Sequence, residues 1–218
     1  GGILTYYLKS IQGKTMIKVY TPSDRFGSNM YLVSSGGATV LVDPSTPPDA
    51  VRADFFGDLP SVDAILLTHA HFDHMLELDT WAKITGAEVC IGQEDAAALS
   101  DPVRNVYRLF TGEDRGYTGA YRTVKDEDVL RFASLEIRVL ATPGHTPGSV
   151  TYLIGDAAFS GDLVFDGGGY GRCDLPGGNL QTLFASIARL AGHTEILTLY
   201  PGHGNSFSPR HLAAQFRS

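Results

Sequence analysis

The chain has 218 residues, and 43% of them are hydrophobic, which is enough to build a sizeable buried core. Its formal net charge of -7 excludes a general polyanion binder, because clustered Lys and Arg side chains are what hold phosphate backbones. We therefore expect no nucleic-acid partner. The composition leaves the oligomeric state open.

The chain also lacks membrane and disulfide signals. No apolar run approaches the roughly 20 residues needed to cross a bilayer, and residues 1–10 contain neither a basic leader nor a long apolar segment. The two cysteines, Cys90 and Cys173, cannot form a framework of bridges, and we expect both to be reduced. These features predict a cytoplasmic protein without a membrane partner.

Hydrophobic patterns predict strands first and then alternating helices and strands. The early strands, at residues 15–20, 29–34 and 38–43, follow each other through short Gly and Ser turns, as in a meander. Later strands are predicted at 63–68, 88–91, 135–140, 149–154 and 195–200, and helices at about 48–56, 74–85, 93–99, 179–191 and 209–217. This order predicts layered α/β structure with helices covering the sheet faces. Because no long linker is visible, we expect residues 1–218 to form one domain.

Residues 101–123 contain turn residues but no clear period, so we expect a long loop there. The segment carries several Arg and Tyr residues on an otherwise acidic chain. One interpretation is a lid in which Arg104, Arg108 and Tyr107 contact an anionic or amphipathic substrate. The alternative is a solvated loop with scattered charges.

The stretch "THAHFDH", residues 68–74, follows a predicted buried strand and precedes a predicted helix. Residues two apart in an extended segment point the same way, so His69 and His71 can converge on one point. The chain then turns, and Asp73 and His74 can face a neighbouring point. Because several unpaired imidazoles are costly to bury together, this spacing favours two adjacent metal ions over a structural histidine cluster.

Three further candidate ligands follow predicted strands or short apolar stretches and stand beside Gly or Pro. His145 lies in "ATPGHTPGS", Asp162 in "AAFSGD" and His203 in "YPGHGN". Taken singly, each is typical of an ordinary loop residue. Together they supply the ligands that the first motif leaves missing.

The order H-x-H-x-D-H, then H, D and H, resembles the metallo-β-lactamase superfamily of metal-dependent hydrolases. The stretches "VLVDPS", "LLTHAHFDH", "TPGHTPGS", "FSGDLVFDGGGYGRCDLPGG" and "YPGHG" are similar to its glyoxalase II-like (hydroxyacylglutathione hydrolase-like) branch. The resemblance spans about residues 16–207. It implies a four-layer αββα sandwich, in which two mixed β-sheets are flanked by helices, with a metal site at one edge between the sheets.

The resemblance also implies which side chains hold the metals. The family pattern assigns His69, His71 and His145 to one ion, Asp73, His74 and His203 to the other, and Asp162 to a bridge between them. It gives Asp73 and Asp162 catalytic roles as ligands. Asp43, at the end of "VLVD", matches an aspartate that accepts a hydrogen bond from a ligand imidazole.

Two residues of "DGGGYGRCD" are candidates for substrate contact, namely Tyr170 and Arg172. Arg172 matches the arginine of the family's GR-x-D stretch, so pairing with Asp174 is the alternative role for it.

We expect two divalent metal ions, with zinc favoured and iron or manganese as alternatives, because nitrogen and oxygen ligands suit all three. Two such ions bind a water between them and lower its pKa toward roughly 7. They also stabilise the negative charge that builds on an attacked carbonyl oxygen. The predicted function is hydrolysis of a small-molecule thioester or related activated acyl compound by a metal-bridging hydroxide.

Three alternatives stay open. The same dinuclear site suits a lactone or ester hydrolase. A mononuclear-iron persulfide dioxygenase keeps a similar motif, and sequence does not show how many metal sites are filled. The third is a catalytically silent binding protein, which the complete set of ligands disfavours. A β-lactamase with a cysteine ligand is a separate class, and Asp162 at the position of that cysteine disfavours it.

Overall fold

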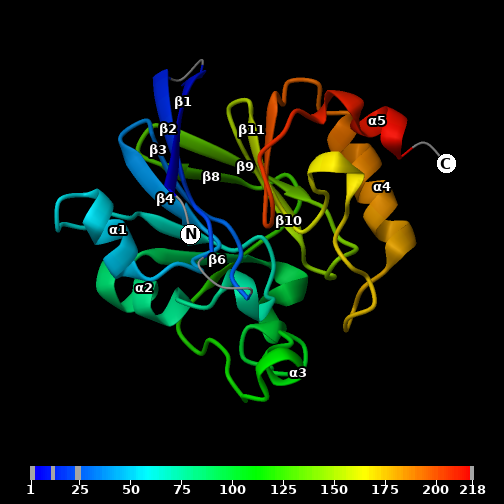
Figure 1. Ribbon diagram of the computed structural model, residues 1–218, viewed down its shortest axis with the longest axis horizontal. Helices are drawn as coiled ribbons and strands as arrows, with labels where there is room; N and C mark the ends of the chain where they lie inside the picture. The colour runs from blue at the N-terminus through cyan, green and yellow to red at the C-terminus, as the bar shows by residue number, and fades with distance from the viewer. Residues whose placement is uncertain (1–2, 11–12, 23–25, 217–218) are drawn as a thin grey trace.

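The computed structural model describes residues 3–10, 13–22 and 26–216. Within these ranges the strands form a seven-stranded sheet and a five-stranded sheet (Figure 1). The order in the larger sheet is β1 (Ile3–Ser10), β2 (Gly13–Tyr20), β3 (Met30–Ser35), β4 (Ala38–Val42), β5 (Ala64–Leu66), β6 (Glu88–Gly92) and β7 (Arg122–Val124). The order in the smaller sheet is β12 (Thr198–Pro201), β11 (Ala157–Gly161), β10 (Val150–Ile154), β9 (Leu135–Ala141) and β8 (Val129–Phe132).

Both sheets are mixed, and their parallel pairs bring strand ends together. In the larger sheet β1 to β4 pair antiparallel, whereas β4 to β7 pair parallel. In the smaller sheet β11 and β12 are parallel. Parallel strands end at the same edge of a sheet. The residues that follow β4, β5 and β6 therefore lie close together at one edge of the larger sheet, and the residues that follow β11 and β12 lie close together at one edge of the smaller sheet.

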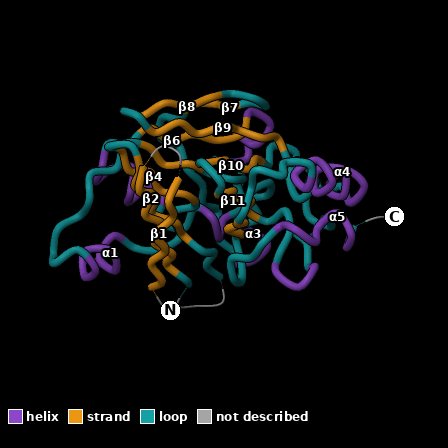
Figure 2. Tube along the Cα trace, turned by 90° about the horizontal axis from the view of Figure 1, so that it is seen from above, coloured by secondary structure: helices purple, strands orange, loops and turns teal. Residues whose placement is uncertain are grey.

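Helices lie outside the two sheets. In Figure 1, α1 and α2 lie on one side of the strands, and α4 and α5 on the other; Figure 2 likewise shows α1 on the opposite side from α4 and α5. The α-helices are α1 (Pro48–Asp54), α2 (Leu78–Thr85), α3 (Tyr107–Thr111), α4 (Leu180–Ala191) and α5 (Leu212–Gln215). The 3-10 helices are η1 (Phe72–His74), η2 (Gln93–Ala98), η3 (Asp166–Gly168) and η4 (Pro209–His211). In the described residues, no helix has the length and apolar character needed to cross a membrane.

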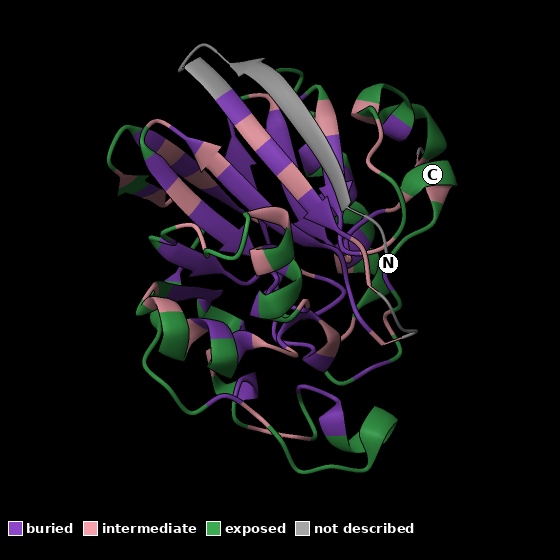
Figure 3. Ribbon diagram, turned by 60° about the vertical axis from the view of Figure 1, so that its left-hand side comes forward, coloured by how far each residue is buried: buried purple, intermediate pink, exposed green. Residues whose placement is uncertain are grey.

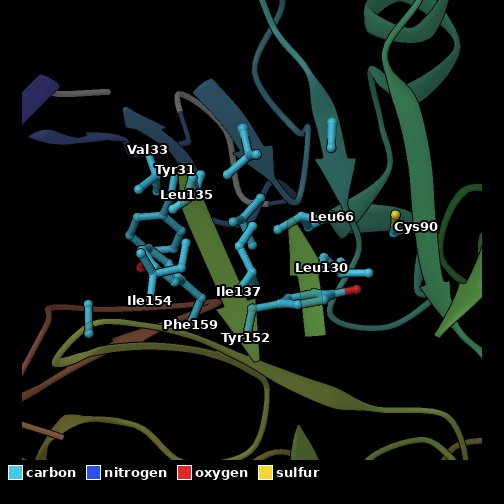
Figure 4. Close-up of a cluster of buried hydrophobic side chains, with 14 of the residues drawn as sticks. Tyr31, Val33, Leu66, Cys90, Leu130, Leu135, Ile137, Tyr152, Ile154 and Phe159 are labelled. Atoms are coloured by element: carbon cyan, nitrogen blue, oxygen red, sulfur yellow. The ribbon is translucent and has the colours of Figure 1, made fainter. Parts of the chain in front are cut away.

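A hydrophobic core lies between the sheets, and the alternation of side chains along each strand builds it. In β5, Leu66 belongs to this inner core while Ile65 packs on the opposite face. In β10, Tyr152 points inward and Leu153 outward. Figure 4 shows Leu66, Ile137 and Tyr152 within the inner core.

Two outer clusters attach the helices to the sheets. Trp81 of α2 packs in the same cluster as Ile65, outside the larger sheet. Leu183 and Ile187 of α4 pack in the same cluster as Leu153, outside the smaller sheet. The layers therefore run helix, sheet, sheet, helix, which confirms the predicted αββα sandwich. Figure 3 shows that the strands are mostly buried and that the helices carry exposed surface.

Several predicted elements are corrected by the structure. The helix predicted at 74–85 is divided, because η1 ends at His74 and α2 begins only at Leu78. The strand predicted at 195–200 begins later, at Thr198. The helix predicted at 209–217 is η4 followed by α5, and residue 217 lies outside the described residues.

Residues 101–123 are also more regular than predicted, since they contain α3 and the start of β7. These elements have five and three residues, and β8 has four, so none is long enough to show a clear period. The strands β1 and β11 are also not predicted from the sequence.

Gly144 lies next to the candidate ligand His145 and packs against α4, so its substitution tests this packing. Its φ of 135° lies in a region that side chains rarely adopt, and a Cβ there would lie 2.3 Å from the backbone of Leu183 in α4. We expect Gly144→Ala to lower the free energy of unfolding by about 2 to 4 kcal/mol, because backbone strain adds to steric overlap. Gly86 has a φ of 64° but open space around its Cβ position. Gly86→Ala is therefore the matched control, with an expected cost of about 1 kcal/mol.

The measurement is urea denaturation of both variants with a metal chelator present, so that metal binding does not contribute. Equal losses in the two variants would contradict the tight contact between Gly144 and α4.

Candidate metal centre

The segment after β5 carries the first candidate ligands. His71 has an extended backbone, with φ -71° and ψ 147°, and its ring centroid lies 4.8 Å from that of His69. The backbone then tightens into η1, where the amide of His74 donates to the carbonyl of His71 at 3.1 Å. After this change from extended to 3-10 geometry, Asp73 and His74 reach a neighbouring point, and the ring centroid of His74 lies 4.1 Å from that of His69.

The candidate ligands gather into two groups. The first is His69, His71 and His145, and the second is Asp73, His74, Asp162 and His203. In each group, one ligand atom per residue lies within 4.8 Å of the others. The structure therefore brings together side chains that span 135 positions of sequence, from residue 69 to residue 203.

Asp162 lies against both groups. Its Oδ2 is 3.5 Å from Nε2 of His145 in the first group and 3.5 Å from Nε2 of His203 in the second. Its Oδ1 is 3.2 Å from Nε2 of His74. Gly202 makes this approach possible, because a Cβ there would lie 2.2 Å from Oδ1 of Asp162. This position corresponds to the bridge that the sequence motif predicts for Asp162.

Unpaired buried atoms test whether these residues suit metal ions. Nε2 of His69, Nε2 of His71, Nε2 of His74 and Oδ1 of Asp162 are buried and make no hydrogen bond, although the last two lie 3.2 Å apart. Leaving such atoms unpaired costs free energy, whereas a cation at the centre would coordinate them. The donors are imidazole nitrogens and carboxylate oxygens, which suit divalent metals. The residues present therefore fit a dinuclear metal site.

The pKa values of the ligands differ between the two groups. Burial lowers the pKa of His69 well below its ordinary value, and burial likewise lowers the pKa of His71 to about 3. Both imidazoles are therefore neutral at pH 7, as metal coordination requires. Burial opposes the charge on His203 as well, but the carboxylates of Asp162 and Asp73 outweigh it and raise the pKa of His203 to about 10. A cation bound by the second group would neutralise these carboxylates in place of the charge on His203.

Asp43 holds the start of the ligand segment. Its φ of 52° places it in the left-handed region at the end of β4. One carboxylate oxygen accepts from the amide of Thr68 at 2.8 Å, and the other accepts from the Thr68 hydroxyl at 2.8 Å. The second oxygen also lies 2.8 Å from Nδ1 of His74. The sequence motif predicts this contact with a ligand imidazole.

A cleft of about 450 Å³ opens onto both groups. The candidate ligands in its lining are His71, Asp73, His145, Asp162 and His203. Tyr170 and Arg172, the two candidates for substrate contact, line the same cleft. Arg172 also pairs with Asp174 through two hydrogen bonds of 2.7 Å, so both of its expected roles are compatible with the structure.

The three lid candidates lie elsewhere. Arg104 lines a smaller neighbouring cavity of about 100 Å³, which also contacts His71. Tyr107 and Arg108 do not line the cleft in the described structure. The Tyr107 side chain is buried beside Phe72, with ring centroids 5.3 Å apart. Arg108 donates two hydrogen bonds to Asp114, at 2.6 and 2.8 Å. Tyr107 and Arg108 therefore lie away from the cleft that holds the candidate ligands, and their contact with substrate stays a prediction.

The site geometry agrees with comparisons to known proteins. A family model described as the metallo-beta-lactamase superfamily matches residues 23–203. The chain belongs to this superfamily. The membership accounts for the αββα layers and for the His and Asp cluster at their edge.

Three known proteins are similar to this chain over most of its length. The probable metallo-hydrolase YqgX of Bacillus subtilis (strain 168) is 34% identical over 178 residues, which cover 81% of this chain and 81% of that protein. The BLEG-1 B3 metallo-beta-lactamase structure has a TM-score of 0.76 at 27% identity and covers 94% of both chains. TTHA1623 in a di-iron-bound form has a TM-score of 0.74 at 33% identity and covers 88% of this chain and 94% of that one.

These relatives support a metallo-hydrolase superfamily assignment without deciding the metal. One is described with iron, and the others are described as a probable metallo-hydrolase and as a lactamase. The His and Asp cluster of this superfamily member is consistent with two divalent ions.

Asp95 is a residue of the site that sequence reasoning missed. It follows β6, and its buried carboxylate joins the two segments that carry the first ligand group. Oδ2 accepts from the amide of Ala70, between His69 and His71, at 3.0 Å. Oδ2 also accepts from the hydroxyl of Thr146, next to His145, at 2.8 Å, and Oδ1 accepts from the amide of Gly148 at 2.7 Å.

The contacts of Asp95 join positions 25 to 53 residues apart, so no local pattern predicts them. Its one sequence signal is its place just after a predicted strand. Burial raises the pKa of Asp95, and the three hydrogen bonds favour its charged form. We therefore expect Asp95 to position the ligand segments without touching the metals.

We expect Asp95→Asn to weaken metal binding by about tenfold, because the amide cannot accept three hydrogen bonds and its charge is lost. The measurement is titration of metal-free protein with Zn²⁺ in competition with a coloured chelator. Asp63 is a matched control, since its carboxylate accepts from the amide of Thr39 at 2.9 Å far from the ligands. Asp63→Asn should leave the Kd for Zn²⁺ unchanged.

Thr146→Val separates positioning from stability, because it removes one donor and leaves the buried carboxylate in place. Metal affinity should fall in this variant as well. Lower thermal stability with unchanged metal affinity in both variants would make Asp95 structural only.

Proposed function

We propose that this chain is a glyoxalase II-like metallo-hydrolase that cleaves a thioester or a related activated acyl compound. The observation that carries the proposal is the pair of buried ligand groups joined at Asp162 beneath an open cleft. The motifs shared with the glyoxalase II-like branch support the reaction class, and the name of the Bacillus subtilis relative supports hydrolysis.

Two divalent ions would be held by the seven ligands already described, with zinc favoured and iron or manganese as alternatives. In the proposed assignment His69, His71 and His145 hold one ion, Asp73, His74 and His203 hold the other, and Asp162 contacts both. When bound, the ions supply Lewis acidity and make water nucleophilic at neutral pH. The chain's own part is to hold these ligands in place.

The carboxylates of Asp73 and Asp162 have a second role in the proposal. Both line the cleft, and Oδ2 of Asp73 lies 3.1 Å from Nε2 of His203. They can orient the attacking water and accept its hydrogen bonds. In the net reaction the water oxygen forms a bond to the acyl carbon and the C–S bond breaks. The products are a carboxylic acid and a thiol, and the thiol sulfur takes one proton of the water.

The test combines metal content with a substrate panel. Protein purified without added metal should contain about two ions per chain. It should hydrolyse thioesters in a panel of S-lactoylglutathione, simple acyl thioesters and acyl-homoserine lactones. Hydrolysis confined to the lactones would contradict the thioester assignment. One iron per chain with persulfide-dependent oxygen uptake and no hydrolysis would overturn the proposal.

Variants of one ligand from each group test the assignment. His145→Ala and His203→Ala should each lower kcat/KM by on the order of a hundredfold or more, because each removes a metal ligand. His211 is exposed and belongs to neither group, so His211→Ala is the matched control with unchanged kcat/KM. An active His145→Ala protein with full metal content would contradict the ligand set.

A further inference from the structure

We propose that the acyl group accepted by this cleft is uncharged and apolar, held between two walls of aromatic and aliphatic side chains. This inference rests on the proposed hydrolase function and names the substrate class within it. It replaces the anionic substrate that the arginines of residues 101–123 suggest.

The first wall is built from η1 and α3. Phe72 directly follows the ligand His71 and stacks on Phe110, with ring centroids 5.5 Å apart and an interplanar angle of 18°. Phe26 meets Phe72 edge-on at 6.1 Å. These three rings and Val106 line the cleft. The wall therefore begins beside the ligands and extends to the partly exposed Phe110, which has 38% of its surface exposed.

The opposite wall comes from the segment after β11. Phe165, Tyr170 and Leu175 line the cleft there. The ring of Phe165 lies 6.0 Å from the ring of His203, so this wall also begins beside a candidate metal ligand. Tyr170 packs edge-on against Phe184 of α4, with ring centroids 5.1 Å apart, which supports the outer part of the wall.

The charge distribution disfavours an anionic acyl group. Among the described residues that line the cleft, Arg172 is the one Arg or Lys. Its Nε and Nη2 donate to both carboxylate oxygens of Asp174, and its guanidinium carbon lies 5.9 Å from the ring centroid of Phe110. A substrate carboxylate would only replace the carboxylate of Asp174, so the net gain would be small.

A carboxylate placed elsewhere along these walls would lose its hydration without gaining a partner, which costs free energy. An apolar chain in the same position gains from leaving water. Burying one methylene group favours binding by roughly threefold to fourfold. The walls therefore favour substrates whose acyl group is apolar. The candidate metal ligands at the base of the cleft set the reaction but not this preference.

The experiment compares acyl thioesters that share one thiol and differ in the acyl group. For the metal-loaded protein, kcat/KM should rise by on the order of tenfold or more from acetyl to hexanoyl. Adipoyl has as many carbons as hexanoyl but ends in a carboxylate, so its kcat/KM should fall back toward the acetyl value. A value for adipoyl that equals or exceeds that for hexanoyl would overturn the inference.

Neighbouring positions on α3 provide a matched pair of variants. Phe110→Ala removes a ring of the wall and should lower kcat/KM for hexanoyl by about fivefold while changing acetyl little. Leu109→Ala removes a side chain that is 65% exposed and does not line the cleft, so the hexanoyl preference should persist. Phe110→Leu should restore part of the preference. Equal effects of Phe110→Ala and Leu109→Ala on hexanoyl would also overturn the inference.

Binding measurements separate failure of this inference from failure of the proposed function. Hexyl and 5-carboxypentyl thioethers of the same thiol cannot be hydrolysed, and calorimetry gives their Kd values. Tighter binding of the hexyl compound, lost in Phe110→Ala, supports the apolar walls even if no thioester is cleaved. Thioester cleavage without a preference for the hexyl compound would leave the hydrolase standing and overturn the inference.

Discussion

The structure depends on one costly arrangement, the burial of imidazole nitrogens and carboxylate oxygens that have no hydrogen-bond partner. Nε2 of His69, Nε2 of His74 and Oδ1 of Asp162 point into the same small region. Such atoms would ordinarily make hydrogen bonds with water or with other polar groups. They remain in place because strand ends, a 3-10 turn and a close glycine contact fix the backbones that carry them.

The three parallel strands β4, β5 and β6 explain how the ligand segment is held. β5 lies between the other two, and the ligands follow it. Asp43 after β4 accepts from the amide of Thr68, and Asp95 after β6 accepts from the amide of Ala70. A carboxylate that follows each neighbouring strand thus accepts from the backbone amide of a residue next to His69. The parallel topology places these carboxylates at the same edge, so sheet pairing and ligand placement have a common cause.

The sequence predicts the parts of this protein that are local or periodic. The H-x-H-x-D-H spacing predicts the meeting of His69 with His71 and of Asp73 with His74. Strands rich in β-branched residues, such as β9 and β10, are predicted as well. The three-residue strand β7 is too short to show a period. Asp95 acts through contacts with distant segments, and the pairing of Arg108 with Asp114 depends on the turn after α3. These features arise from tertiary geometry, which a linear pattern does not contain.

The candidate metal ligands and the walls of the cleft come from different parts of the fold. The ligands follow strands whose positions are fixed by two sheets and their cores. The walls come from η1, the short α3 and the segment around Tyr170, which lie outside both sheets. Changes in those segments can alter the apolar surface of the cleft without moving a ligand. The superfamily motif therefore carries information about the reaction, whereas the choice of substrate depends on side chains such as Phe110 that no part of the motif contains.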